Sequence, residues 1–195
     1  MNSIDYQVIP IEELRINPWE VANRLNVPRG FDSAEIDGCF AELKKVVNCK
    51  MSAVRVPVKK LSDNRLDCGF GEFTSETLLK NLKHCKEVFV FAATTGIGVD
   101  RLLEKLSLIS PAKHFITDAL ASAVAEALAD KAEELLCEGV GHRPRFSPGF
   151  GDLSIELQPR ILEFINAGRL LGITVNNAYL MSPMKSVTAF IGIEG

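Results

Sequence analysis

The segment RFSPGFGD, residues 145–152, combines side chains that could bind a small charged molecule. A residue that precedes proline is pushed out of the helical region, so the run HRPRFSPGF is predicted to be extended. In an extended backbone Arg145 and Ser147 point to the same side. Pro148 and Gly149 suit the two central positions of a type II turn, in which Gly149 supplies the positive φ.

Arg145 has the clearest chemistry in this segment. Its guanidinium is planar and always charged, so it can hold a carboxylate through two hydrogen bonds. Phe150 would add an apolar face, and the small Gly149 would leave backbone groups open to a flat ligand. The alternative is that Arg145 pairs with a nearby acidic side chain and that the turn only reverses the chain. The sequence leaves both interpretations open.

Glu126 belongs to a long alanine-rich helix predicted for residues 118–139. Leucine and valine side chains recur on one face of this helix at spacings of four and seven residues. The opposite face carries Ser122, Glu126, Asp130 and Glu133. A solvated surface is the default interpretation of such a polar face.

The composition excludes several classes of protein. The chain has 195 residues, of which 47% are hydrophobic and 24% charged, which is typical of a folded domain with one core. A net charge of −3 opposes binding to a phosphate backbone, so no nucleic-acid partner is expected. The N-terminus lacks a basic region before an apolar run, and the most apolar stretch is too short to span a bilayer. We therefore expect a cytoplasmic protein without a membrane partner.

Two other motifs offer little chemistry. The five cysteines include no C-x-x-C pair, so reduced and mostly buried thiols are expected, with no metal site. The segment TTGIGVDRLL lacks the third glycine of a dinucleotide fingerprint and the ending of a nucleotide-triphosphate loop. We interpret it as a tight connection from a strand to a helix.

Predicted strands and helices are interleaved along the chain. Helices are predicted near residues 17–26 (with Asn17 as cap and Trp19 as anchor), 33–47, 76–84, 97–108, 118–139 and 159–172. Strands are predicted near 51–61, with a sheet edge at Pro57, and near 66–73, 87–96, 173–177 and 186–193. This order predicts an α+β fold, a mixed or antiparallel twisted sheet flanked by helices. We expect a single domain over residues 1–195, with a helical N-terminal segment of about residues 1–48 packed on it.

A family resemblance joins these segments. The stretches RFSPGFGD, ELQPRILEFINAGRLLGITV and NNAYLMSPMKSVTAFIGI together resemble the activation, or reactivation, domain of cobalamin-dependent methionine synthase. They resemble still more closely the short stand-alone bacterial proteins of that family. The likeness continues upstream through INPWEVANRLNVPRGFDSAEI, CKEVFVFAATTGIGVDRLL and ITDALASAVAEALAD, so it spans nearly the whole chain. It implies the fold of that activation domain.

The resemblance implies binding of S-adenosylmethionine. In the multidomain enzyme, one electron from a flavoprotein and a methyl group from S-adenosylmethionine restore methylcobalamin. The implied partners are the cobalamin-binding domain of a methionine synthase or related corrinoid protein and a flavodoxin-like reductant. Cobalamin would be met only through that partner protein, and no catalytic side chain is expected in this chain.

The resemblance also assigns ligand contacts to the RFSPGFGD segment. It suggests that Arg145 holds the methionine carboxylate and that backbone groups at Ser147 and Gly149 meet the adenine. Phe150 stands where the family usually has tyrosine.

Three further residues enter through the resemblance. Glu126 falls where the family has a helical glutamate near the ligand. Met181 and Ser182 fall near the family's tyrosine-serine pair.

Two alternative functions stay open. One is a docking partner of a corrinoid protein that has lost S-adenosylmethionine binding, and the other is a methyltransferase that acts on another small substrate.

Overall fold

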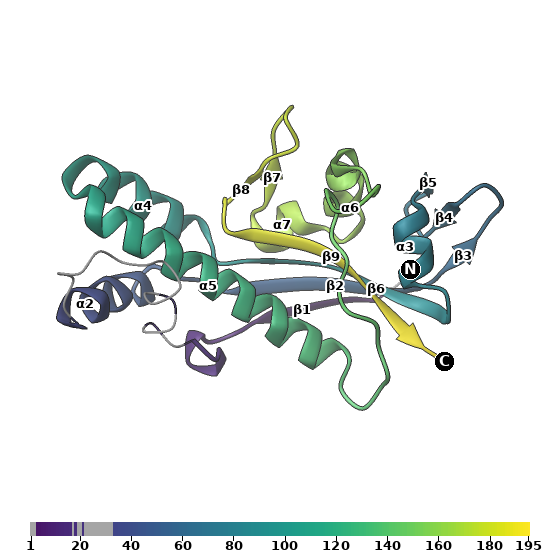
Figure 1. Cartoon of the computed structure of the whole chain (residues 1–195), viewed down its shortest axis with the longest axis horizontal. Helices are drawn as coiled ribbons and strands as arrows, with labels where there is room; N and C mark the ends of the chain where they lie inside the picture. Colours follow the sequence, from purple (N-terminus) through teal and green to yellow (C-terminus); the bar gives the residue numbers. More distant parts are fainter. Residues whose placement is uncertain (1–2, 17, 19–20, 22–32) are drawn as a thin grey trace.

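The computed structural model describes residues 3–16, 18, 21 and 33–195 (Figure 1). Its main sheet has four antiparallel strands in the order β1-β2-β6-β9. Their bounds are β1 (Ile4–Val8), β2 (Lys50–Pro57), β6 (Cys85–Thr94) and β9 (Ser186–Glu194). Most of the helix predicted at residues 17–26, including Asn17 and Trp19, lies outside the described residues.

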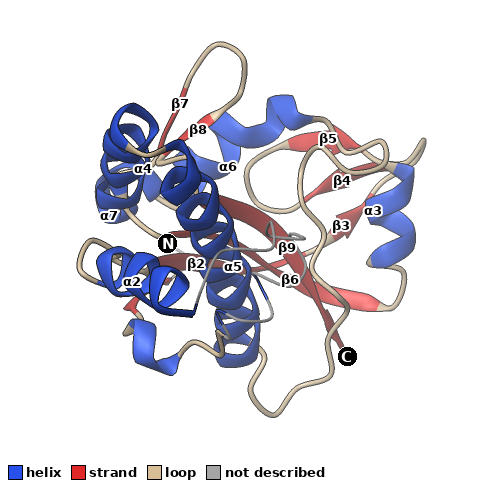
Figure 2. Cartoon of the chain, turned by 60° about the vertical axis from the view of Figure 1, so that its left-hand side comes forward, coloured by secondary structure: helices blue, strands red, loops and turns tan. Residues whose placement is uncertain are grey.

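Three helices cover one face of the main sheet: α2 (Ser33–Lys44), α4 (Ile97–Ile109) and α5 (Pro111–Leu136). Figure 2 shows α5 crossing in front of the strands, with α2 and α4 beside it. The helix begins at Ser110, whose side chain accepts a hydrogen bond from the backbone of Lys113, and Pro111 occupies a first-turn position where no backbone donor is needed. The long apolar face that the sequence predicts for residues 118–139 is the face with which α5 packs on the core.

The other face carries shorter elements. Its helices are α3 (Glu76–Asn81), α6 (Gln158–Phe164) and α7 (Ala167–Leu171). Two small sheets accompany them: β3 (Lys59–Lys60), β4 (Arg65–Asp67) and β5 (Glu72–Thr74), and the pair β7 (Thr174–Val175) and β8 (Met181–Ser182). Single 3-10 turns lie at η1 (Ile11–Glu13) and η2 (Ile155–Leu157).

Strand β6 explains why both faces are covered. Val90 and Ala92 face the core under α6 and α7, whereas Phe91 and Ala93 face the core under α5. Side chains alternate across a strand, so a continuous apolar run buries both sides of the sheet. The buried central strand predicted at residues 87–96 is confirmed, and so is the α+β fold with antiparallel sheets flanked by helices.

Two local features differ from the sequence prediction, and a third agrees with it. The segment of about residues 1–48, predicted to be helical, contains strand β1 at Ile4–Val8, which pairs with β2. The helix predicted for residues 159–172 is two helices, α6 and α7, because Asn166 adopts a left-handed φ of 55° between them. Asparagine tolerates that conformation better than most residues, but an α-helix cannot continue through it. Strand β2 lies inside the sheet, but β1 pairs with it only as far as Val54. Among the described strands Pro57 therefore pairs with β6 alone, so it lies at a local sheet edge, as predicted.

The two-glycine connection between β6 and α4 is tight. Gly96 precedes α4 with a φ of 87°, and a side chain at Gly98 would collide with the backbone carbonyl of Val46. Packing therefore accounts for both glycines.

All five cysteines are buried and free, and burial raises the pKa of Cys49 to about 12. No helix in the described part of the chain is long and apolar enough to cross a bilayer.

Candidate functional site

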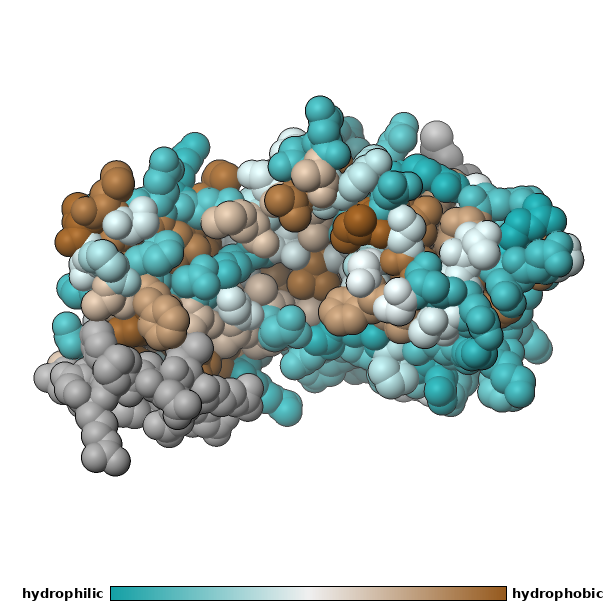
Figure 3. All heavy atoms as spheres, turned by 45° about the horizontal axis from the view of Figure 1, so that its top comes forward, coloured by the Kyte–Doolittle hydropathy of each residue, from teal (hydrophilic) through white to brown (hydrophobic). Residues whose placement is uncertain are grey.

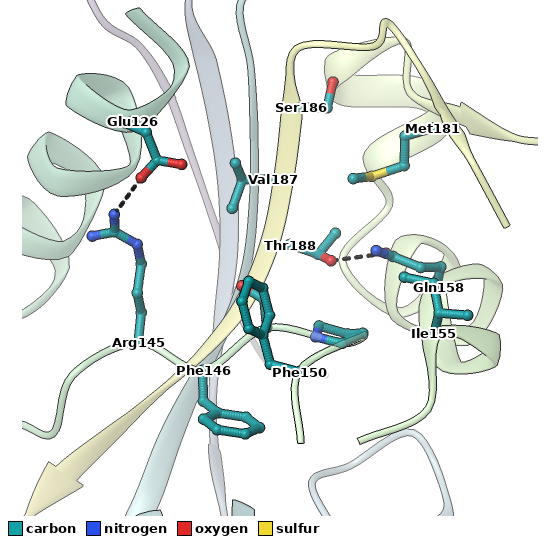
Figure 4. Close-up of a pocket in the computed structure, with 12 residues that line it drawn as sticks. Glu126, Arg145, Phe146, Phe150, Ile155, Gln158, Met181, Ser186, Val187 and Thr188 are labelled. Atoms are coloured by element: carbon teal, nitrogen blue, oxygen red, sulfur yellow. Dashed lines mark hydrogen bonds and ion pairs between the residues drawn. The ribbon is translucent and has the colours of Figure 1, made fainter. Parts of the chain in front are cut away.

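The segment before the turn is extended, as predicted, because it pairs with β9. His142 bridges to Ile193, and Phe146 bridges to Phe190 through two backbone hydrogen bonds of 2.9 Å. The Phe146 side chain packs on the apolar cluster that contains Phe190. Side chains alternate along an extended segment, so Arg145 is directed away from that cluster and toward α5 (Figure 4).

The predicted turn at Pro148 and Gly149 is present. Gly149 has a φ of 92°, and the backbone N–H of Phe150 donates to the carbonyl of Ser147 at 3.3 Å. Both features are those of a type II turn. The N–H of Gly149 donates to the carbonyl of Leu153 at 2.8 Å, so it is already used within the loop. Only the other backbone groups of this turn are left for a ligand.

Asp152 ties the turn to the start of α3. Its carboxylate accepts hydrogen bonds from the hydroxyl of Ser75 at 2.7 Å and from the backbone N–H groups of Glu76 and Thr77 at 2.6 and 3.1 Å. These bonds, that of the Ser75 hydroxyl foremost, hold the pKa of Asp152 well below its usual range. A carboxylate at a helix N-terminus also satisfies backbone donors that have no partner within the helix. These hydrogen bonds thus hold the turn beside Arg145 against the start of α3.

We expect Asp152→Asn to lower the thermal midpoint at pH 7 by several degrees, since an amide cannot replace all of these acceptor bonds. The folded-state pKa lies below the ordinary value of 3.8. The stabilisation is therefore fully present above about pH 4 and is lost as the pH falls further. Thermal melts of both proteins between pH 7 and pH 2 should show a difference that narrows only below about pH 4.

Asp37→Asn, at an exposed position of α2, serves as the control and should melt like the wild type throughout. An Asp152→Asn protein that melts with the wild type at pH 7 would contradict the anchoring role.

Arg145 lies against three carboxylates of α5. Its Nη1 donates to Asp130 at 2.5 Å and to Glu133 at 3.0 Å, and its Nη2 donates to Glu126 at 2.9 Å. The side chains of Glu126 and Asp130 are 69% and 68% exposed, whereas that of Glu133 is 15% exposed. The pairing of Arg145 with acids, which the sequence left as an alternative, is therefore present, but two of the three acids lie at the surface.

The charges of this cluster do not balance. Burial lowers the pKa of Arg145, but its hydrogen bonds, those to Asp130 and Glu133 before the one to Glu126, outweigh burial and raise the pKa overall, so the guanidinium stays charged. Three carboxylates face one guanidinium, and His142 approaches Glu133 at 3.4 Å. The cluster therefore keeps a surplus of negative charge that would favour a cationic ligand group.

A cavity of about 500 Å³ opens beside this cluster, which is within the usual range of small-molecule sites. Figure 4 shows Arg145 and Glu126 on one side, Met181, Gln158 and Ile155 on the other, and strand β9 along the floor between them. In the space-filling view of Figure 3, hydrophobic residues surround a hollow on this face of the molecule. The cavity is thus an open groove with charged side chains at one end and mainly apolar side chains along the rest of its lining.

Most of the predicted site residues meet at this cavity. Its lining includes Glu126, Arg145, Ser147, Phe150 and Met181. Gly149 and Ser182 are not part of the lining: Gly149 shapes the turn, and Ser182 is exposed in β8. Their roles in ligand binding stay predictions, as do those of the residues that the cavity brings together.

Seven of the twelve described residues that line the cavity were not among the site residues predicted from the sequence. The additional residues are Phe146, Pro148, Ile155, Gln158, Ser186, Val187 and Thr188. One of them carried a usable signal, because Thr188 is a polar residue inside the largely apolar strand SVTAFIGI. Buried polar residues of this kind need a partner, so they point to a special environment.

Comparison with known proteins supports the fold. No protein-family profile matches the sequence, and no curated protein matches it. Among solved structures, the chain is similar to a crystal structure of the MetH reactivation domain bound to AdoHcy, with a TM-score of 0.68 and 15% sequence identity. The match covers 99% of this chain and 79% of that one. The activation-domain fold expected from the resemblance is therefore confirmed, and at this identity the likeness concerns the fold alone.

Proposed function

We propose that this protein binds S-adenosylmethionine in the cavity between α5 and α6 and presents its methyl group to a cobalamin held by another protein. The observation that carries the proposal is the open cavity with Arg145 and Glu126 at one side, in a fold similar to a domain bound to AdoHcy. In the proposed reaction the methyl group passes from the sulfonium sulfur to cobalt, and S-adenosylhomocysteine remains. A flavodoxin-like reductant supplies one electron.

The charged side of the cavity suits the amino acid end of this ligand. Glu126 is the exposed partner on Nη2 of Arg145, so a ligand carboxylate can take its position while Asp130 and Glu133 keep Nη1. Released from the guanidinium, Glu126 would face the α-amino group. The surplus of negative charge also favours the sulfonium, because opposite charges attract more strongly in a partly buried site.

The apolar side suits the nucleoside. Phe150 lines the cavity but is 66% exposed, so its ring is available as a flat surface for a base. Met181 lines the wall opposite α5. Because the groove is open to the surface, a methyl group bound there can be reached by a second protein. Orientation and electrostatics are all that this chain needs to supply.

A second candidate is the docking partner that has lost its ligand. It is favoured by the bonds already made at the site, since three carboxylates occupy Arg145 and the N–H of Gly149 is used by Leu153. Under this alternative a corrinoid protein would bind equally well with and without S-adenosylmethionine. Binding to that partner that strengthens with the ligand would support the first proposal instead.

Calorimetry of the wild-type protein with S-adenosylmethionine tests the proposal. We expect saturable binding at one site, and weaker binding of 5′-methylthioadenosine, which lacks the carboxylate and the amino group. The absence of heat at ligand concentrations up to about 1 mM, where binding free energies are only about −4 kcal/mol, would remove the proposal.

Phe150→Ala should weaken binding of S-adenosylmethionine by about 5- to 150-fold, since stacking of a base on an aromatic ring is worth about 1–3 kcal/mol. The same calorimetric titration measures the loss. Phe150→Tyr restores the residue type usual in the family and should bind at least as well as the wild type. Equal affinities for all three proteins would show that the ring is not part of the site.

A further inference from the structure

Gln158 and Thr188 form a buried polar pair at the cavity. Gln158 is the first residue of α6 and Thr188 lies near the start of β9, and they are only 3% and 2% exposed. The hydroxyl of Thr188 donates to Oε1 of Gln158 at 2.8 Å. Figure 4 marks the contact between the two side chains with a dashed line. Both residues belong to the lining of the cavity, on the side away from Arg145.

The pair leaves the amide nitrogen of Gln158 unused. A primary amide carries two N–H donors, and no described residue accepts a hydrogen bond from them. Within the described residues, the enclosed side-chain atoms without a partner are Oδ1 of Asn81 and Oγ1 of Thr117. The nitrogen of Gln158 is not among these enclosed atoms, and the residue lines the cavity, so a molecule bound in the cavity could accept its hydrogen bonds.

The hydrogen bond with Thr188 holds the Gln158 amide in place at the wall of the cavity. In the structure the threonine hydroxyl gives its single hydrogen to Oε1, and the amide nitrogen keeps both of its hydrogens for other partners. The oxygen has a second lone pair and can still accept another bond. Gln158 therefore carries a free donor beside an acceptor that is only partly used.

We propose that Gln158 reads the adenine of the ligand, with Thr188 as the positioning residue; this rests on the proposed function. A glutamine amide matches the N6 and N7 edge of adenine, to which it donates one hydrogen bond and from which it accepts another. The amino acid end of the ligand lies at Arg145 and Glu126, so its base reaches the opposite side, where Gln158 is found (Figure 4). A base with an oxygen at position 6 would place that oxygen against Oε1 of Gln158, and two acceptors cannot form a hydrogen bond with each other.

Ligand analogues test this on the wild-type protein without any substitution. S-adenosylhomocysteine should bind about 5- to 150-fold more tightly than S-inosylhomocysteine, whose base has the 6-oxo group, the range that one bidentate pair provides. The 7-deaza analogue of S-adenosylhomocysteine should also lose affinity. Equal calorimetric affinities for the three ligands would overturn the inference while leaving the proposed function intact. Failure of all three to bind would remove both.

Two variants assign the effect to these residues. Gln158→Met keeps a long unbranched side chain and should abolish the preference for adenine over hypoxanthine. Thr188→Val keeps the shape of the side chain but removes the hydrogen bond that holds the amide in place, so it should reduce the preference. A role in packing alone would lower the thermal midpoint and leave the preference unchanged, and that result in either folded variant would contradict the inference.

Discussion

Arg145→Ala is expected to weaken binding of S-adenosylmethionine by about 30-fold or more. Truncating one partner of a buried, hydrogen-bonded charge pair costs about 2–5 kcal/mol, and the side chain of Arg145 is 24% exposed. Without the guanidinium, the ligand carboxylate would also face Glu126, Asp130 and Glu133 unshielded. Calorimetric titration of both proteins with S-adenosylmethionine measures the effect.

Arg143 provides a matched control for this experiment. It lies two residues away on the same extended segment and forms a longer ion pair, 3.6 Å, with Glu194. Arg143→Ala should bind the ligand like the wild type, because Arg143 does not line the cavity. Binding of 5′-methylthioadenosine, which has no carboxylate, should change much less in Arg145→Ala. Equal losses for both ligands would indicate a collapsed cavity instead of a lost carboxylate contact.

Phe190→Ala is expected to lower the free energy of unfolding by about 3–5 kcal/mol. Phe190 is fully buried in β9, and its ring centroid lies 5.9 and 6.1 Å from those of Phe73 and Phe70. Its backbone also holds Phe146 beside Arg145 through two hydrogen bonds. Chemical denaturation at 25 °C should give the loss of stability directly.

Phe115→Ala is the matched control, because Phe115 is in α5 and 50% exposed. We expect it to change the free energy of unfolding by less than about 1 kcal/mol. Equal losses of stability in the two variants would contradict the role of the aromatic cluster around Phe190 in supporting the site.

Local rules predicted the parts of the site that depend on neighbouring residues. Pro148 and Gly149 restrict their own φ angles, so the turn followed from the sequence alone. The extension around Arg145 followed in the same way from the prolines. The apolar face of α5 was visible because leucine and valine recur at helical spacing. Each of these features is encoded within a few consecutive residues.

Contacts between distant segments could not be predicted in this way. Gln158 and Thr188 meet because α6 packs over β9, which no spacing along the chain reveals. The polar face of α5 was interpreted as solvated, yet it holds Arg145, and Ser122 accepts a hydrogen bond from Lys185 at 2.9 Å. Strand β1 was missed because its side chains are mostly exposed, so it lacks the alternation of a half-buried strand.

A crystal structure of the protein with S-adenosylhomocysteine would show whether the cavity beside Arg145 is the binding site. We predict that the ligand fills the cavity beside α5, that its carboxylate replaces Glu126 on Nη2 of Arg145, and that its adenine lies against Phe150. A structure at saturating ligand in which the molecule binds elsewhere, or in which Arg145 still holds Glu126 above a cavity without ligand, would contradict the account.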